Sequence, residues 1–361
     1  MNYRVAFLSV VPSPYQRDIF AALARRSDVD LRVDYLEAAA PDSPWPEKPL
    51  PAYSQILRGF WFPVGRARCH VNYPPLDYRD RELVVLNTMI SATAQWLMRF
   101  GLRGKPWIFW GERLSERPPG RPSLRDFFTA PLNNAAAIAG IGSLANRQYA
   151  AQFPKPKHFN IPYYCELAPF LDAHRAERDS ANTVFLFCGQ MIPRKGLDNL
   201  LDAFALLLGR YPHIRLLLAG REAGLGARLD RMPGAVRARI EYAGFVAPED
   251  LPRLFARADV FILPSRYDGW GVVVNQAIGA GLPVICSEAV GAGHDLVEPE
   301  VNGLRFQPGY VPALSRCMER FAAEPTLAAQ WGAASRAKAV DWTPDKGAAK
   351  WVDVFSEVLG R

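Results

Sequence analysis

The sequence predicts an α/β protein made of two doubly wound domains, each with its own parallel sheet. Short runs rich in apolar residues alternate with longer amphipathic segments over nearly all of the 361 residues, a pattern typical of βαβ units. The length exceeds what one hydrophobic core usually supports. A proline-bearing stretch, Phe153–Ala173, interrupts the pattern near the middle, and the alternation then restarts.

The expected strands fall into two sets. The first set is Tyr3–Val10, Leu31–Leu36, Leu83–Leu86, Trp107–Trp110 and Ala136–Ile141. The second set is Thr183–Cys188, Arg215–Ala219, Ile240–Tyr242, Val260–Leu263 and Pro283–Cys286. Amphipathic helices are expected between most of these strands, so each set should form a separate sheet.

The prolines of Phe153–Ala173 forbid a continuous helix and favour an extended connector. We therefore expect an N-terminal domain at 1–165 and a C-terminal domain at 166–340. Residues 341–361 should be a helix, because Trp351, Phe355 and Leu359 form a stripe at i, i+4 and i+8 within Trp342–Leu359. The proline-dense stretch Pro41–Pro51 is expected to be a long loop.

Charge, hydropathy and cysteine content exclude few classes of function. The net charge of +7 suits an anionic ligand, an acidic acceptor or a membrane surface. No run of apolar residues is long enough to cross a bilayer, and the five cysteines show no paired spacing, which favours a reduced, cytoplasmic setting. No cluster of His or Cys residues has metal-ligand spacing, so no metal is expected. One stretch combines basic residues with the aromatic residues Trp96, Phe100 and Trp107, and it is either a binding surface or simply a solvated basic face. Its basic residues are Arg99, Arg103, Lys105, Arg113, Arg117, Arg121 and Arg125.

Two strand ends of the second set carry residues suited to a ligand. Thr183–Cys188 runs into Gly189-Gln190-Met191-Ile192-Pro193-Arg194-Lys195-Gly196, ahead of an amphipathic helix from Leu197 to Leu208. Free N–H groups and the helix dipole favour a diphosphate there, the alternative being an ordinary βα loop. Val260–Leu263 runs into a glycine-bearing turn, in which Asp268 stands at the carboxyl end of the strand and Gly269 and Gly271 allow close approach of a ligand.

In the order of these motifs, the chain resembles the family 4 retaining glycosyltransferases. The matching pieces, strong from Thr183 to Arg305 and looser elsewhere, are 189–196, Ala243-Gly244-Phe245-Val246, 258–265, 268–277, Gly281-Leu282-Pro283-Val284-Ile285 and Val301-Asn302-Gly303-Leu304. The resemblance implies the GT-B fold, in which two Rossmann-like domains face each other across a cleft. It also implies that the C-terminal domain holds the donor, that the N-terminal domain is on the acceptor side, and that the last helix returns to the N-terminal domain.

The resemblance also assigns the donor-binding residues. Lys195 would hold the leaving diphosphate, and Asp268 with the backbone amides after it would bind the sugar hydroxyls. Gln276 would bind the ribose, and the backbone of 244–246 would bind the base. The family has glutamates where this chain has Asp268 and Gln276, so weaker donor binding is expected. It has an arginine where this chain has Gln190, for which Arg194 would compensate, the alternative being that Arg194 faces solvent. The full set is Gly189, Gln190, Arg194, Lys195, Gly244, Phe245, Val246, Asp268, Gly269, Trp270, Gly271 and Gln276.

On the acceptor side, Tyr15, Gln16 and Arg17 follow the first strand, where the family has a glycine-rich loop. For Arg17 the alternative is a residue that only decorates the first helix. Glu112, at the end of Trp107–Trp110, joins Lys195 and Asp268 as a candidate catalytic residue, and is expected to be partly buried. Its alternative is a salt bridge to Arg113 or Arg117. His294 is expected to make local contacts only.

The resemblance implies a metal-independent hexosyltransferase without a cofactor, which moves a sugar from a UDP or GDP sugar to an acceptor hydroxyl with retention of configuration. Bacterial glycan, lipopolysaccharide or glycoconjugate synthesis would be its setting, and the acceptor a glycan, a lipid-linked sugar or a small molecule. The expected location is cytoplasmic, with peripheral contact at the inner face of the membrane, and no nucleic acid is expected as a partner. The alternatives are an epimerase or phosphorylase of the same fold, or a non-catalytic relative that binds sugar nucleotides.

Overall fold

The computed structural model describes residues 2–39, 49–65, 67–115, 124–173 and 181–361. Two compact units are present: residues 1–165 together with 344–361, and residues 166–343. We refer to these as the first and the second unit. Most of the proline-dense stretch 41–51, and the predicted basic residues Arg117 and Arg121, lie outside the described residues.

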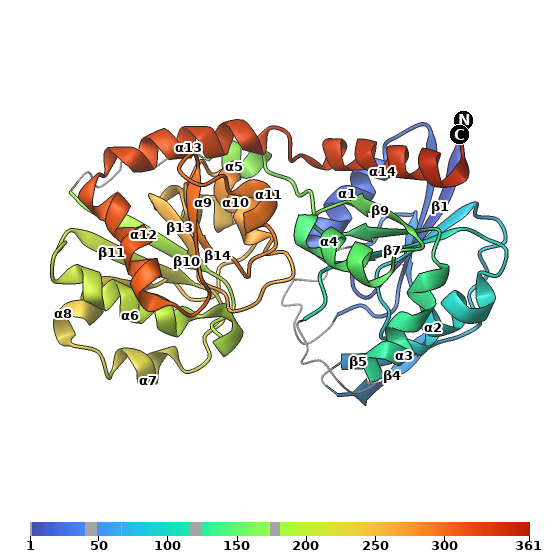
Figure 1. Ribbon diagram of the computed structural model, residues 1–361, viewed down its shortest axis with the longest axis horizontal. Helices are drawn as coiled ribbons and strands as arrows, with labels where there is room; N and C mark the ends of the chain where they lie inside the picture. Colours follow the sequence, from blue (N-terminus) through green and yellow to red (C-terminus); the bar gives the residue numbers. More distant parts are fainter. Residues whose placement is uncertain (1, 40–48, 66, 116–123, 174–180) are drawn as a thin grey trace. The chain divides into compact units, whose positions relative to one another are not determined.

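The first unit is built on a seven-stranded parallel sheet. Its strand order is β3-β2-β1-β6-β7-β8-β9, so the chain builds outward from β1 in one direction and then in the other (Figure 1). The strands are β1 (Tyr3–Ser9), β2 (Val29–Tyr35), β3 (Ser54–Ile56), β6 (Leu83–Leu86), β7 (Trp107–Gly111), β8 (Ala137–Gly140) and β9 (Lys157–Asn160).

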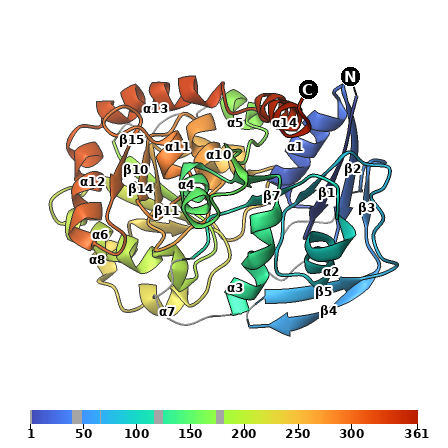
Figure 2. The ribbon, with the colours of Figure 1, turned by 45° about the vertical axis from the view of Figure 1, so that its right-hand side comes forward.

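Helices cover both faces of this sheet because its strands are apolar on both sides. On one face Phe7 packs against Phe20 of α1 and Trp351 of α14, and these two helices lie side by side in Figures 1 and 2. On the other face Leu8 and Leu97 share a buried cluster. The helical segments are α1 (Pro14–Ala24), α2 (Ala92–Trp96), the π-helical η1 (Leu97–Gly101), α3 (Leu124–Thr129), the 3₁₀ turn η2 (Ala130–Asn134), α4 (Ser143–Gln152) and α14 (Pro344–Leu359).

A separate two-stranded hairpin belongs to the first unit. It consists of β4 (Gly59–Val64) and β5 (Ala67–Asn72), which pair antiparallel and form a sheet of their own. The strand β5 contacts α2, and the backbone N–H of Asn72 donates to the Thr93 hydroxyl over 2.9 Å. The hairpin is therefore anchored on one strand, while β4 stays exposed along nearly its whole length.

The second unit has a six-stranded parallel sheet with the order β12-β11-β10-β13-β14-β15. Its strands are β10 (Thr183–Cys188), β11 (Ile214–Ala219), β12 (Ile240–Tyr242), β13 (Val260–Leu263), β14 (Val284–Ser287) and β15 (Gly303–Phe306). Its helical segments are α5 (Ala168–Asp172), the 3₁₀ turn η3 (Pro193–Lys195), α6 (Leu197–Leu208), α7 (Leu225–Leu229), α8 (Gly234–Arg237), α9 (Leu251–Ala256), α10 (Val273–Gly279), α11 (Gly293–Leu296), α12 (Val311–Ala323) and α13 (Thr326–Ala339).

The predicted α/β class with two parallel sheets is confirmed. The expectation that Phe153–Ala173 is an extended connector is wrong in part. Residues 157–160 form β9, and α5 begins one residue before Pro169, which is tolerated in a first helical turn because no N–H is needed there.

The last helix also differs in detail from the expectation. It begins at Pro344, and Trp342 instead stacks on Trp270 within the second unit, with ring centroids 6.0 Å apart. In α14 the side chains of Trp351 and Phe355 are buried, whereas Leu359 near its end is only half-buried.

No helix among the described residues is long and apolar enough to cross a membrane.

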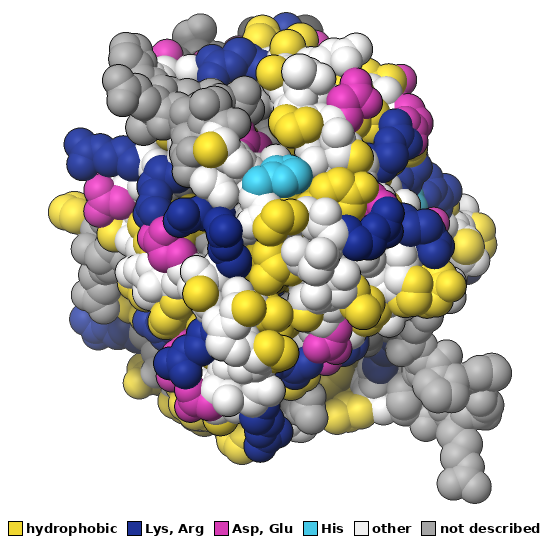
Figure 3. Space-filling view, turned by 90° about the vertical axis from the view of Figure 1, so that its left-hand side faces the viewer, with side chains coloured by type: hydrophobic (Ala, Val, Ile, Leu, Met, Phe, Trp, Pro, Cys, Tyr) yellow, Lys and Arg dark blue, Asp and Glu magenta, His cyan; other side chains and the backbone are white. Residues whose placement is uncertain are grey.

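On the face that Figure 3 shows, Lys and Arg side chains are interspersed with Asp and Glu.

Candidate functional site

The strand order of the second sheet reverses between β10 and β13. From β10 the chain adds β11 and β12 on one side, and then β13, β14 and β15 on the other. In open parallel sheets, ligands bind outside the carboxyl ends of the strands at such a reversal, because the two loops diverge there. The two loops at this point are 189–196, which follows β10, and 264–272, which follows β13.

These loops bring Lys195 and Asp268 together. The Lys195 Nζ lies 2.5 Å from Asp268 Oδ2, and both side chains are largely buried. The Arg194 guanidinium lies 3.6 Å from the other carboxylate oxygen and donates to the backbone C=O of Tyr267 over 2.9 Å. Two cations therefore meet one carboxylate, which leaves an excess of positive charge at the carboxyl ends of β10 and β13.

The backbone of the first loop is held in place by close packing and by Arg266. At Gly196 φ is +68°, and a Cβ there would lie 2.2 Å from the carbonyl oxygen of Pro264, so no other residue fits. Arg266 donates to both carboxylate oxygens of Asp198 and to the carbonyl of Pro193. Both loops are thereby fixed to each other before any ligand is present.

Asp268 is also fixed through its own backbone. Its N–H donates to the C=O of Ala289 over 3.0 Å, and its C=O accepts from the N–H of Gly291 over 3.2 Å. The Ser265 hydroxyl lies 3.3 Å from Asp268 Oδ2. Contacts with three neighbouring segments therefore hold the Asp268 carboxylate in one orientation, unlike a charge on a mobile surface side chain.

The remaining predicted donor residues lie in the same unit but in different settings. Trp270 is fully buried and donates through its indole N–H to Asn275, so only its backbone could meet a ligand. Gln190 and Gln276 are half-buried, the first after β10 and the second in α10. After β12, Phe245 is exposed and the Arg221 guanidinium lies 5.5 Å from its ring centre. Their roles toward a donor stay predictions.

His294 makes local contacts, as expected. Its Nε2 lies 2.9 Å from the backbone C=O of Glu288, and its Nδ1 lies 3.0 Å from the guanidinium of Arg305. Because an arginine can only donate, Nδ1 must accept and Nε2 must carry the proton. These two contacts fix the orientation of the ring.

The first sheet has its own reversal, between β1 and β6. Here Gln16 donates through its side-chain amide to Asn87 Oδ1 over 2.5 Å, and Tyr15 packs on Tyr163 with ring centroids 4.6 Å apart. Burial, with the nearby Glu112 carboxylate, holds the pKa of Tyr163 well above its usual value, so this phenol is neutral. Arg17 donates to the backbone C=O of Pro49.

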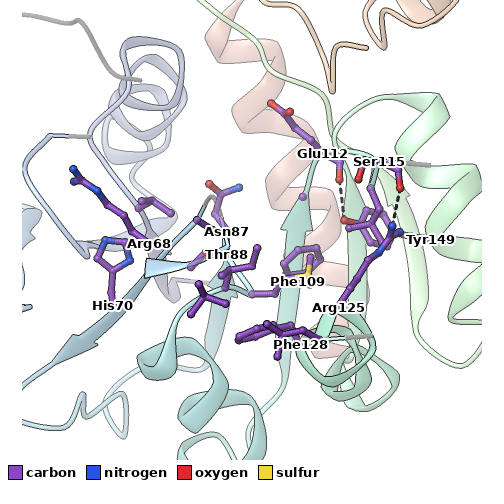
Figure 4. A pocket seen from close by; sticks show the side chains of 18 of the residues that line it. Arg68, His70, Asn87, Thr88, Phe109, Glu112, Ser115, Arg125, Phe128 and Tyr149 are labelled. Atoms are coloured by element: carbon purple, nitrogen blue, oxygen red, sulfur yellow. Dashed lines mark hydrogen bonds between the residues drawn. The ribbon is translucent and has the colours of Figure 1, made fainter. Parts of the chain in front are cut away.

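A cavity of about 740 Å³ lies beside this reversal, entirely within the first unit. Figure 4 shows Arg68 and His70 on one side, Arg125 and Tyr149 on the other, and Asn87 between them. Phe109, Phe128 and other apolar side chains complete the lining. Polar groups on an apolar wall are typical of small-molecule sites. The described residues that line it are Val10, Glu37, Val64, Ala67, Arg68, His70, Asn87, Thr88, Met89, Ile90, Phe109, Gly111, Glu112, Leu114, Ser115, Leu124, Arg125, Phe128, Tyr149 and Tyr163.

Glu112 lines this cavity, but the expectation that it is partly buried is wrong. It follows the last residue of β7 and its side chain is exposed, while its backbone C=O accepts from the Tyr149 hydroxyl over 2.8 Å. Of its two suggested partners, Arg117 lies outside the described residues.

Sequence reasoning missed several polar residues of the cavity. Arg68 and His70 lie on β5, which was not predicted, and both approach the Glu37 carboxylate, at 2.7 and 3.3 Å. Asn87 was missed although it follows a predicted strand. A polar residue directly after a buried parallel strand is the signal that could have found it.

Within the described residues, no group of three or more His, Cys, Asp or Glu side chains is arranged to hold a metal ion. The pair Asp28 and Asp30 has Asp-x-Asp spacing, but it lies at the amino end of β2. There Asp28 pairs with Arg26 and Asp30 with Arg81.

Residues 182–324, which contain the Lys195–Asp268 pair, match the family model described as glycosyl transferases group 1. By these likenesses the chain has the GT-B fold, and most of its second unit is similar to the group 1 glycosyl transferases. Over 98% of its length it is similar to the solved Anabaena HepE in complex with UDP, covering 100% of that chain with a TM-score of 0.74 at 16% identity. At this identity the likeness shows the fold alone.

Curated relatives match this chain over shorter stretches. It is 40% identical to the O-antigen chain mannosyltransferase B of Escherichia coli over 106 residues, 28% of each chain. It is 29% identical to a GDP-mannose-dependent monoacylated alpha-(1-6)-phosphatidylinositol monomannoside mannosyltransferase of Corynebacterium glutamicum over 237 residues, 61% of this chain and 60% of that protein. The chain thus spans less than two thirds of the length of these relatives.

Proposed function

We propose that this chain is a retaining glycosyltransferase that moves a hexosyl group from a nucleoside diphosphate sugar to an acceptor hydroxyl. The observation that carries the proposal is the buried Lys195–Asp268 pair at the reversal of the second sheet, with Arg194 beside it. A pre-positioned cation suits a diphosphate, and a pre-positioned carboxylate suits sugar hydroxyls.

In this proposal Lys195 acts on the leaving group. Without a donor, its ammonium is neutralised by Asp268 at 2.5 Å. When a diphosphate binds, its oxygens compete for the same ammonium, and Asp268 is released to accept hydrogen bonds from the sugar. The charge on the diphosphate grows as the bond to the sugar breaks, so the cation stabilises the transition state more than the ground state.

The chemical step follows a front-face route. The bond between the anomeric carbon and the diphosphate oxygen breaks with both electrons going to the oxygen. The acceptor oxygen forms its bond to that carbon on the same face. The acceptor's proton passes to the departing phosphate oxygen, so configuration is retained and no protein nucleophile is required.

The base and ribose would be held near Phe245 and Gln276. Phe245 is exposed, with Arg221 over its ring, which offers an aromatic and cationic platform beside the backbone of 244–246. Both UDP and GDP fit this setting: the HepE structure holds UDP, and the Corynebacterium relative is named as GDP-mannose-dependent.

We assign the acceptor to the cavity of the first unit. Asn87 and Tyr163 line it, and Gln16 and Tyr15 lie directly behind them. Glu112, exposed at its edge, would orient the attacking hydroxyl. The named acceptors of the two relatives are an O-antigen chain and a phosphatidylinositol mannoside, which favours a glycan or lipid-linked acceptor in bacterial glycoconjugate synthesis.

The proposal includes no metal and no cofactor, since Lys195 and Arg194 supply the positive charge that the diphosphate needs. It places the enzyme in the cytoplasm, in peripheral contact with the inner face of the membrane, with no nucleic acid as a partner.

The test is a panel of UDP and GDP sugars, offered with and without glycan or lipid-linked acceptors. Release of nucleoside diphosphate and a product with the donor's anomeric configuration by NMR are expected. Asp268→Asn should lower transfer while calorimetry shows nucleoside diphosphate binding unchanged or tighter, because Lys195 is then free. Asp230→Asn, a surface carboxylate paired with Arg237, is the control. A folded protein that releases no diphosphate from any donor would refute the proposal, and interconverted sugars without release would indicate an epimerase.

A further inference from the structure

Large apolar side chains that stay exposed in the first unit all lie in one stretch of the chain, from β3 to α3. Extensive exposed apolar surface marks a contact with another molecule or with a membrane. The residues are Ile56, Phe60, Trp61, Phe62, Tyr73, Ile90, Trp96, Phe100, Leu124 and Phe127.

The hairpin β4–β5 contributes three of them in a row. Phe60, Trp61 and Phe62 are 58%, 45% and 43% exposed. Because successive residues of a strand point to opposite faces, aromatic rings project from both faces of the hairpin. A protein partner would cover one face of a sheet, whereas the interfacial layer of a bilayer surrounds an inserted hairpin on both faces.

Arginines lie on several of these rings. The guanidinium of Arg68 is 4.1 Å from the ring centre of Trp61, that of Arg99 is 4.6 Å from Phe127, and that of Arg103 is 5.3 Å from Phe100. Figures 1 and 2 both show β4 and β5 beside α2 and α3. We call this set the aromatic–arginine surface: Phe60, Trp61, Phe62, Phe100 and Phe127, with Arg68, Arg99 and Arg103.

Along the sequence, the charge of the chain is concentrated in the segment that contains this surface. Residues 54–127 contain twelve Lys or Arg against six Asp or Glu, and so hold nearly all of the net charge of +7, while the rest of the chain is almost neutral. Aromatic rings with arginines favour the headgroup layer of a bilayer, and anionic lipids attract such a basic segment. The partner that matches both properties is a membrane that contains anionic phospholipids.

We infer that the chain docks on anionic phospholipid bilayers through the aromatic–arginine surface, with the β4–β5 hairpin inserted among the headgroups. The inference rests on the proposed function in one respect: the hairpin and α3 both line the cavity assigned to the acceptor, through Val64, Arg68 and Arg125. A docked chain would therefore present that cavity to a sugar carried on a lipid.

The test is flotation of the whole chain with vesicles of phosphatidylcholine, with and without phosphatidylglycerol. Binding is expected only to the anionic vesicles, and should fall steeply as the salt is raised, because exposed charges are screened. The double variant F60S/F62S should bind about tenfold more weakly, because the apolar area that enters the interface is lost. Arg58 is exposed directly before β4, and R58Q/R103Q should lose about fivefold in vesicle binding per arginine.

Two variants of the second unit are matched controls. L206S/V340S removes exposed apolar side chains, and R231Q/R253Q removes exposed charges, so both should bind vesicles as the unaltered chain does. F60S/F62S should still release nucleoside diphosphate from a donor in the absence of vesicles, because neither residue lines the cavity.

Absence of binding to anionic vesicles would overturn the inference, whatever the donor assay shows. Equal binding by F60S/F62S and by its control would also overturn it. Self-association in sedimentation that F60S/F62S abolishes, without vesicle binding, would make the surface a contact between two copies of the chain. Conversely, vesicle binding without any donor turnover would support this inference and refute only the proposed function.

Discussion

The two sheets share the order of six strands, to which the first adds the edge strand β9, and the two units differ in the residues that lie where this order reverses. In the second unit, Lys195 and Asp268 form a buried ion pair there. In the first unit the corresponding place holds two uncharged amides, Gln16 and Asn87, beside the neutral phenol of Tyr163. A cation matches a diphosphate, while amides and hydroxyls match the hydroxyls of a sugar. The shared fold thus supplies the place, and the residue types at that place set the chemistry.

The two units also differ in which part of the chain supplies the helix that packs a tryptophan into the core. In the first unit, α14, which is the last helix of the chain, covers the sheet: Trp351 is fully buried with its ring edge-on to Phe7 and to Trp110. In the second unit, Trp331 of α13 packs on Phe321 of α12 in a similar edge-on contact. Loss of Trp351 or of Trp331 should therefore destabilise only the unit that contains it.

The largest expected effect comes from Trp351→Ala. Removal of a fully buried indole leaves a cavity and should destabilise the first unit by about 3–5 kcal/mol. Hydrogen exchange should show lost protection in β1 and β7 and unchanged protection in β10 and β13. Trp331→Ala should give the reverse pattern. If Trp351→Ala loosens both sheets equally, the units are not independent and the comparison fails.

Next in size is Lys195→Ala. Loss of a charge-assisted contact to the diphosphate should weaken donor binding and slow turnover by about 2–3 kcal/mol in total. Calorimetry with nucleoside diphosphate and steady-state kinetics measure the two parts. Arg194→Gln should cost less, because this guanidinium is more exposed and 3.6 Å from the carboxylate. Unchanged kinetics in folded Lys195→Ala would place the diphosphate elsewhere.

The contrast between the units also shows which strands can be predicted from the sequence. Central strands such as β10 and β13 are buried on both faces, so their apolar runs predict them directly. Lys157–Asn160 forms an edge strand that is only half-buried, so it lacks the apolar run of a core strand. The strand β4 does have an apolar run, but this run contains Pro63, which is not expected in a core strand, and its side chains stay exposed in the hairpin.

The candidate site was predictable residue by residue but not as a set of contacts. Lys195 and Asp268 stand out because each follows a strand in a recognisable motif. Their ion pair joins residues 73 apart and depends on β10 lying beside β13, which only the sheet order provides. Likewise, nothing local marks Glu37, Arg68 and His70 as neighbours, because the hairpin brings them together.

A smaller effect is expected from Gln276→Glu, which adds a charge to the second unit and so increases its difference from the uncharged site of the first unit. If residue 276 serves the ribose, a carboxylate should accept its hydroxyls better and tighten nucleoside diphosphate binding by about 1 kcal/mol. Gln190→Glu should instead weaken binding, because it would face the diphosphate. Calorimetry on both variants decides this, and unchanged affinity in Gln276→Glu would place the ribose elsewhere.

The smallest effect concerns the support of the charged loop, where Asp198 holds Arg266 across both carboxylate oxygens. Burial raises the pKa of Asp198, but the hydrogen bonds and charge of Arg266 outweigh it, so the pKa lies below its usual value. The carboxylate therefore stabilises the folded chain at neutral pH, and this contribution is lost as the pH falls below about 4. Because the pair is partly exposed, Asp198→Asn should cost only about 0.5 kcal/mol at pH 7. Urea unfolding should show the gap to the unaltered chain closing toward pH 3, whereas Asp202→Asn, on the same helix and 3.7 Å from Arg228, should show almost none at either pH. A gap that persists at low pH would mean that the carboxylate acts through its shape in the loop and not through its charge.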